Sequence, residues 1–415
     1  MKKRFILLML LLAAFLSGSA YAAQTVKVED ARIEFPASTT VFRSEDSTTG
    51  YEVTFVYDNP DATEVKIRGE WSFSDARNSS LYTSLNATPN EYENGMFPLQ
   101  IDAGDEWLIE DMECDAETGV WRYTIPLPCG VWSYRFIVTT EDGMFETSDP
   151  NNRPVERAPG QQTNSQVYVP FDPERQIDDW SIQFPRTDGK TGTLDMIYFD
   201  ASDLDYELLD EPSVAVYLPY GYDENREEPY RILYALHGSG IESETSWWNK
   251  GVIGNLTDNL VADYGIEPFV IVMPNSYADS FDYNNITERV IPLVEENYNV
   301  STNEEDRAIC GISMGAIAAK NILLNTPEEF RYYGLFSGAY FSESTEVFDG
   351  KRISDRKVYL AAGEREDGLI AVYRTADKLA NAGLTGYHLY TVMGGHNWYT
   401  WRQIYVDFVL NELWG

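Results

Sequence analysis

The stretch that decides the fold of the second half of the chain runs from Ala308 to Leu324 and reads AICGISMGAIAAKNILL. Residues 308–310 form an apolar, strand-like run, and residues 316–324 have the composition of a good helix that ends before Pro327. A Gly-x-Ser-x-Gly motif with Ser313 at its centre lies between them. A nucleophile elbow requires this order of strand, sharp turn and helix, because glycines permit the tight turn that lifts the serine hydroxyl above the sheet. The motif therefore predicts that Ser313 is a nucleophile.

The region around this motif, residues 191–415, has the pattern of an α/β fold. Apolar, strand-like runs lie at residues 213–218, 232–236, 269–273, 308–310 and 357–361. Helix candidates alternate with them, near residues 251–264, 284–298, 314–325, 368–382 and 399–413. Such alternation predicts a mostly parallel sheet that is covered by helices on both faces.

A serine hydroxyl is a poor nucleophile at neutral pH and needs a neighbouring base. The chain has only three histidines. His396 lies in a glycine-rich loop between the late strand 387–391 and the last helix, which is where an α/β-hydrolase places its base. His388 lies within that strand and is expected to pack, and His237 precedes an early glycine turn. The prediction is therefore that His396 is the base.

The third member of a catalytic triad should be an acid that follows a strand between the serine and the histidine in sequence. The loop 363–368 follows the predicted strand 357–362 and contains two adjacent acids, Glu366 and Asp367. We take Asp367 as the triad acid, with Glu366 as the alternative. Its carboxylate would orient the imidazole and stabilise the imidazolium.

Backbone N–H groups are expected to hold the oxyanion that forms during acyl transfer. One donor is predicted at Met314, the residue after the nucleophile, and the other at Gly238 or Ser239, in the loop after the early strand. A plain glycine turn is the alternative reading of that loop. Trp247 and Trp398 are candidate substrate-binding residues. The predicted chemistry needs no metal and no organic cofactor.

The charge of the chain excludes some partners. The sequence has 31 Lys and Arg against 67 Asp and Glu, a formal net charge of −36. A surface this acidic repels phosphate backbones and anionic lipid heads, so we expect neither nucleic acid nor membrane as a partner.

The N-terminus has the layout of a secretory signal peptide over residues 1–22. A basic start is followed by an apolar run from Phe5 to Leu16 and a small-residue stretch that ends at Ala22. Twelve apolar residues are too few for a membrane anchor, which needs about 20. Export permits disulfides. Cys114 and Cys129 could be bridged or could remain two thiols, and Cys310 is expected to be a small core residue.

Residues 25–170 differ in pattern from the rest of the chain. Short alternating strands are separated by turn signals, which is typical of an immunoglobulin-like antiparallel β-sandwich. The polar segment 171–190, which contains Pro173 and Pro185 and directly follows Pro170, is predicted to connect this domain to the α/β domain.

The α/β region resembles the esterase D-like family, in particular the secreted family 1 carbohydrate esterases, which include feruloyl and acetylxylan esterases. The stretches that carry the resemblance are Val216–Pro219 with Gly221-Tyr222, Leu236–Gly238, Val272–Asn275, Gly311–Gly315 and Gly394–Trp398 with Trp401-Arg402. This chain departs from the family pattern at Ala316, where a second glycine is usual, and at Glu366, where the family usually has aspartate three residues after the glycine.

The N-terminal region resembles the early-set β-sandwich related to glycogen-binding modules, which precedes the esterase in several secreted plant-cell-wall esterases. The stretches that carry this resemblance are Val53–Phe55, Pro60–Ala62, Val65–Trp71, Gly130–Phe136 and Asp149–Asn151. Its tryptophans could stack on sugar rings, but core packing is the better expectation for most of them: Trp71, Trp107, Trp121 and Trp132. Resemblance of fold does not show sugar binding.

Together these features predict a secreted carboxylester hydrolase that removes feruloyl groups from plant cell-wall xylan or its oligosaccharide esters. The alternatives are an acetylxylan esterase, which would differ in the size of the acyl pocket, and an exported siderophore esterase, because that group also joins a β-domain to an esterase D-like domain. The alternative from another class is a carbohydrate-binding protein with an inactive hydrolase fold.

Overall fold

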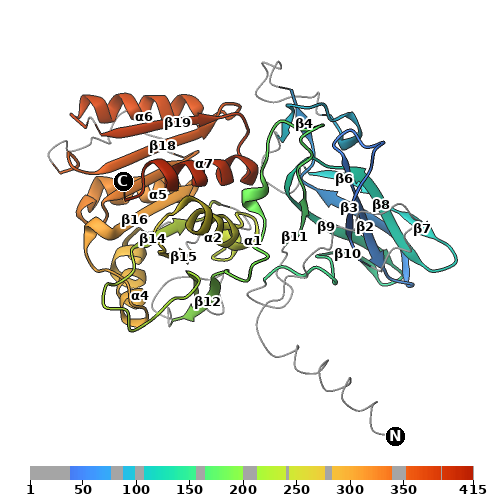
Figure 1. Cartoon of the computed structure of the whole chain (residues 1–415), viewed down its shortest axis with the longest axis horizontal. Coiled ribbons are helices and arrows are strands. Elements are labelled where there is room, and N and C mark those ends of the chain that lie inside the picture. Colours follow the sequence, from blue (N-terminus) through green and yellow to red (C-terminus); the bar gives the residue numbers. More distant parts are fainter. Residues whose placement is uncertain are drawn as a thin grey trace, which may run out of the picture.

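A computed structural model describes residues 38–75, 87–98, 107–155, 164–199, 213–239, 243–275, 283–338, 352–384 and 386–414. The predicted signal peptide lies outside these residues. The chain forms a β-rich part and an α/β part that lie side by side (Figure 1). No helix in the described ranges has the length and apolar character that a membrane span requires.

The β-rich part consists of two antiparallel sheets that face each other. One has the strand order β1-β2-β8-β7, and the other has the order β10-β9-β3-β6 with β11 also beside β9. Side chains alternate along β3, where Val65 and Ile67 are fully buried and Lys66 and Arg68 are not. Phe55 of β2 meets Tyr134 of β9 edge to face, with ring centroids 4.7 Å apart. The predicted β-sandwich is confirmed, and all four of its tryptophans named above are buried.

The strands of this part are β1 (Thr40–Arg43), β2 (Tyr51–Asp58), β3 (Ala62–Gly69), β4 (Phe73–Ser74), β5 (Phe97–Pro98), β6 (Leu108–Asp111), β7 (Glu113–Asp115), β8 (Val120–Pro126), β9 (Gly130–Thr140), β10 (Gly143–Thr147) and β11 (Ser165–Val169).

The α/β part is built on an eight-stranded sheet of order β12-β13-β15-β14-β16-β17-β18-β19. Strands β12 and β13 pair antiparallel with their neighbours, and the remaining pairs are parallel. Its strands are β12 (Thr193–Tyr198), β13 (Ser213–Leu218), β14 (Ile232–Leu236), β15 (Val270–Pro274), β16 (Arg307–Ile312), β17 (Tyr332–Phe336), β18 (Lys357–Gly363) and β19 (Tyr387–Val392).

The helices of this part are α1 (Ser246–Asn249), α2 (Ile253–Tyr264), α3 (Tyr283–Asn285), α4 (Ile291–Asn297), α5 (Met314–Asn325), α6 (Leu369–Asn381) and α7 (Trp398–Asn411). The predicted helix at 284–298 is three short pieces, because a π-helical turn at Ile286–Val290 separates α3 from α4.

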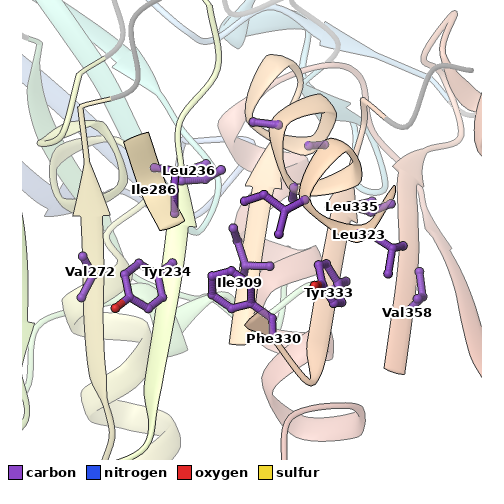
Figure 2. Packing of buried hydrophobic residues seen from close by; sticks show 14 of the residues in the cluster. Tyr234, Leu236, Val272, Ile286, Ile309, Leu323, Phe330, Tyr333, Leu335 and Val358 are labelled. Atoms are coloured by element: carbon purple, nitrogen blue, oxygen red, sulfur yellow. The ribbon is translucent and has the colours of Figure 1, made fainter. Parts of the chain in front are cut away.

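Helices cover both faces of this sheet, as the sequence predicts. Along β14, Tyr234 and Leu236 belong to the core under α4, α5 and α6, whereas Leu233 and Ala235 belong to the core under α2 and α7. Figure 2 shows the first core, where Leu323 of α5 lies against the sheet. Because β14, β16, β17 and β18 are parallel, their carboxyl ends share one edge, which is where ligands bind in open α/β sheets.

The three cysteines are free thiols. Cys114 is exposed and lies opposite Trp121, whereas Cys129 is buried, so the bridge that the sequence left open is not formed. Burial raises the pKa of the Cys129 thiol to about 12. Cys310 is buried in the sheet, as expected of a small core residue.

One arginine joins the two parts of the molecule. The Arg402 side chain, in α7, is only 1% exposed. Its Nε donates to the carbonyl oxygen of Lys250 and its Nη1 donates to that of Val131 in β9, each at 2.8 Å. Its Nη2 lies 3.6 Å from a carboxylate oxygen of Glu70, which follows β3. The sandwich is therefore tied to the helix that follows the His396 loop.

Replacing Arg402 by alanine is expected to lower the free energy of unfolding by about 3–5 kcal/mol, because it removes one partner of a buried ion pair and leaves two carbonyls without their donor. Unfolding in guanidinium chloride measures the change. Arg352→Ala is the control: its partner Glu328 and Arg352 itself are 57% and 43% exposed, so a loss of at most about 1 kcal/mol is expected. Equal losses in the two variants would contradict the role of Arg402.

Candidate active site

Ser313 lies where β16 ends and α5 begins, at the edge of the sheet. Its φ of +51° is in a region that non-glycine residues rarely adopt, and its side chain is half-buried. The glycine of the motif at 315 is required sterically, because a Cβ there would lie 2.4 Å from the carbonyl oxygen of His237. The local structure is the strained strand-to-helix turn that the sequence predicts.

His396 lies on the loop between β19 and α7 and contacts a buried carboxylate. Its Nδ1 lies 2.9 Å from Oε2 of Glu366, and the side chains of the two residues are 26% and 1% exposed. A carboxylate only accepts hydrogen bonds, so Nδ1 carries the hydrogen and Nε2 is left to accept a proton. This is the arrangement that prepares an imidazole to act as a base.

Our prediction that Asp367 contacts the histidine is wrong, and the alternative acid, Glu366, makes the contact. The reason is the turn that follows β18. The Glu366 N–H donates to the Gly363 carbonyl at 3.2 Å, and the Gly363 N–H donates to Glu366 Oε1 at 2.7 Å. This turn folds the Glu366 carboxylate back onto the end of β18, where it is buried, whereas Asp367 is exposed.

The acid loop and the histidine loop are tied together by their backbones. The Glu364 N–H donates to the Val392 carbonyl at 2.8 Å, and the Arg365 N–H donates to the Gly394 carbonyl at 3.0 Å. Asn397 then caps α7, because its Oδ1 accepts from the Thr400 N–H at 3.1 Å. Its Nδ2 donates to the carbonyl of Pro98 at 3.2 Å, so the β-sandwich also contacts this loop.

The predicted oxyanion donors lie beside the nucleophile. Met314 is the first residue of α5, and a Cβ on Gly238 would lie 3.5 Å from the Ser313 Cβ. The Gly238 carbonyl is 2.7 Å from Nδ1 of His237, which fixes the peptide that joins Gly238 to the exposed Ser239. The structure thus places Met314 and Gly238 beside the elbow, with Ser239 next to Gly238 in the chain. The oxyanion role itself remains a prediction.

Trp247 and Trp398 do not line the site. They are 1% and 0% exposed and meet edge to face in the core beneath α7, with centroids 5.1 Å apart. Trp247 Nε1 donates to the carbonyl of Leu236 at 3.1 Å. Neither ring can contact a substrate in this arrangement, so the substrate-binding role that we expected of them is withdrawn.

Sequence reasoning missed two residues of this site. The Trp401 ring meets the His396 ring edge to face, with centroids 5.0 Å apart. Ser337, directly after β17, donates from its hydroxyl to Glu366 Oε1 at 2.6 Å. Trp401 could have been found from the Trp401-Arg402 pair that carries part of the resemblance. No local sequence pattern indicates Ser337.

Comparisons with known proteins found similarity to esterases. Residues 207–408 match the family model described as "Putative esterase". The endo-1,4-β-xylanase/feruloyl esterase of Xylanibacter ruminicola is 32% identical over 203 residues, 45% of this chain and 27% of that protein. Endo-1,4-β-xylanase Y of Acetivibrio thermocellus is 31% identical over 179 residues, 37% of this chain and 16% of that protein. The chain therefore spans about a quarter or less of the length of these relatives.

One similar solved structure spans both parts of the chain. The enterobactin esterase of Shigella flexneri has a TM-score of 0.53 and 16% identity, covering 91% of this chain and 96% of that one. At this identity the likeness concerns the fold alone. Residues 207–408 are therefore similar to the esterase family over somewhat less than half of the chain, and the chain has an α/β-hydrolase fold.

Proposed function

We propose that this chain is a secreted serine carboxylesterase that removes feruloyl groups from plant cell-wall xylan or its oligosaccharide esters. The observation that carries the hydrolase assignment is the contact of His396 with the buried Glu366 at the same sheet edge as the elbow serine, Ser313. The similarity to a xylanase/feruloyl esterase over 45% of the chain supports feruloyl as the acyl group and xylan as the polymer. The signal-peptide pattern of residues 1–22 supports export.

In the proposed mechanism the Ser313 oxygen attacks the acyl carbon while Nε2 of His396 takes the hydroxyl proton. The N–H of Met314 and that of Gly238 or Ser239 stabilise the negative charge that develops on the carbonyl oxygen. As the tetrahedral intermediate collapses, the bond to the sugar oxygen breaks and His396 gives its proton to that oxygen. A water molecule then attacks the acyl carbon while His396 takes one of its protons. The bond between that carbon and the Ser313 oxygen breaks as His396 returns the proton to Ser313, and the carboxylic acid leaves.

Glu366 supports each proton transfer. Its carboxylate keeps the hydrogen on Nδ1 and stabilises the imidazolium that forms in both halves of the reaction. The substrates that this proposal implies are neutral polysaccharide esters. A chain with a net charge of −36 repels anionic polymers but not neutral ones.

Three substrates distinguish the candidate functions: methyl ferulate, acetylated xylan and the cyclic triester enterobactin. We expect kcat/KM on methyl ferulate to exceed that on simple acetate esters by at least about ten-fold. One extra methylene in a hydrophobic pocket already changes kcat/KM by about that much, and an aromatic acyl group buries more apolar surface than one methylene. Equal rates on methyl ferulate and acetate esters would remove the feruloyl assignment. Preference for enterobactin would favour the siderophore esterase, whose two-part fold this chain shares.

A further inference from the structure

The residue after β17, Ser337, combines three properties that few residues share. Its side chain is buried, being 1% exposed. Its φ of +54° lies in the left-handed region that favours glycine. Its N–H donates to the carbonyl of Ala361 in β18 at 2.7 Å, which extends the sheet hydrogen bonding by one residue beyond the end of β17. The sheet therefore holds a serine in a backbone conformation that glycine would adopt more easily.

This turn passes directly over the nucleophile. A Cβ on the next residue, Gly338, would lie 1.9 Å from the carbonyl oxygen of Ser313, so only glycine fits there. The Ser313 N–H donates to the carbonyl of Phe336 at 2.9 Å. The segment 336–338 is thus fastened to the elbow, and the position of Ser337 relative to the catalytic serine is fixed.

The direction of the hydrogen bonds at Ser337 follows from the chemistry of its neighbours. The Trp401 Nε1 lies 3.0 Å from Ser337 Oγ, and an indole N–H can only donate. Glu366 Oε1 lies 2.6 Å from the same oxygen, and a carboxylate can only accept. Ser337 therefore accepts from Trp401 and gives its single hydroxyl hydrogen to Glu366.

These bonds leave one carboxylate oxygen for the histidine. Glu366 Oε1 is occupied by two donors, the Ser337 hydroxyl and the Gly363 N–H at 2.7 Å. Its Oε2 faces Nδ1 of His396 at 2.9 Å. Rotation of the carboxylate about its last bond would break both bonds to Oε1, so the pair of donors fixes the plane in which Oε2 meets the imidazole.

We propose that Ser337, oriented by Trp401, is a positioning residue that holds the Glu366 carboxylate in register with His396. Trp401 contacts both Ser337 and His396. Its indole N–H donates to Ser337, and its ring lies edge-on to the His396 ring, at an interplanar angle of 85°. The inference rests on the proposed hydrolase function for its kinetic consequence, whereas its structural consequence does not require turnover.

The test uses the full chain with Ser337→Ala, Ser337→Gly and Trp401→Phe. Ser337→Ala and Ser337→Gly remove both hydrogen bonds of the Ser337 hydroxyl, and Trp401→Phe removes only the one from the indole. In each variant we expect kcat on p-nitrophenyl acetate to fall about ten- to a hundred-fold, as loss or weakening of a hydrogen bond to a charged group warrants. KM should change by less than about two-fold, because no group that contacts the ester is altered. Ser337→Gly separates the effect of the backbone conformation from the effect of the hydroxyl. Glycine adopts a φ of +54° freely but lacks the hydroxyl.

A low-field proton resonance from the His396 Nδ1–H reads the contact with Glu366 directly, and we expect it to shift or broaden in all three variants. Ser165→Ala is the matched control: Ser165 is also 1% exposed and its hydroxyl also makes two hydrogen bonds, but within the β-sandwich. This control should keep both kcat and the resonance.

Wild-type kcat in Ser337→Gly, or a lower kcat with an unchanged resonance, would overturn the proposal. A wild-type chain that hydrolyses no ester would refute the proposed function instead. In that case the resonance alone decides the positioning role, which is supported if the signal changes in Ser337→Ala and overturned if it does not.

Discussion

Replacing Ser313 by alanine is expected to lower kcat on p-nitrophenyl acetate by about a million-fold, the size of loss that follows when a triad serine is removed. The substitution deletes the oxygen that is proposed to form the acyl-enzyme. Alanine removes only one atom from a half-buried side chain, so the fold should persist. Any remaining rate enhancement would come from the oxyanion donors and from substrate binding.

Two measurements make this result specific to Ser313. Mass spectrometry after treatment with a fluorophosphonate should place the covalent adduct on the peptide that contains Ser313, and the adduct should be absent from the Ser313→Ala variant. Ser181→Ala, a change at an exposed serine, is the control and should keep full activity. A variant at 313 that retained kcat within about a hundred-fold would mean that another group performs the attack.

The parts of the fold that could be predicted are those encoded by local periodicity. Alternation along β3 and the apolar runs of β14 and β16 depend on neighbours a few residues away, so the sequence displays them directly. The same holds for Ser313, whose motif, strand and helix are contiguous. His396 was predictable because its loop lies between a strand and a helix that are both evident.

The parts that could not be predicted depend on contacts between distant residues. Ser337 bonds to Glu366 at a separation of 29 residues and to Trp401 at a separation of 64, so nothing near it in sequence indicates its role. Trp247 and Trp398 illustrate the opposite problem. An aromatic side chain near a catalytic loop suits a binding surface and a core equally well, and only the packing of α7 on the sheet decides between them.

The choice between two adjacent acids is a finer case of the same kind. Successive residues in a tight turn point in different directions, and the turn at residues 363–366 is closed by a bond that uses the Glu366 side chain itself. The resemblance favoured aspartate at the third position after the glycine, and this chain keeps the position but lengthens the side chain by one methylene. Position in the turn, more than residue type, therefore determines which carboxylate reaches the histidine.

This argument predicts that Glu366→Gln lowers kcat by about ten thousand-fold, because a neutral amide neither holds the hydrogen on Nδ1 of His396 nor stabilises the imidazolium. Asp367→Asn should change kcat by less than about three-fold. The two substitutions remove the same charge from neighbouring positions, so an effect of net charge would appear in both. Initial rates on p-nitrophenyl acetate at saturating substrate measure the difference.

The glutamine variant also separates catalysis from folding. Its Oε1 can still accept from the Ser337 hydroxyl and the Gly363 N–H, so the turn and the sheet edge keep their hydrogen bonds. Only the end of the side chain that faces His396 has changed. An unaltered thermal unfolding transition together with a large loss of kcat would therefore locate the effect in the contact with the imidazole. If Asp367→Asn produced the larger loss, the turn would have to present the other carboxylate during the reaction, and the role of Glu366 would become structural.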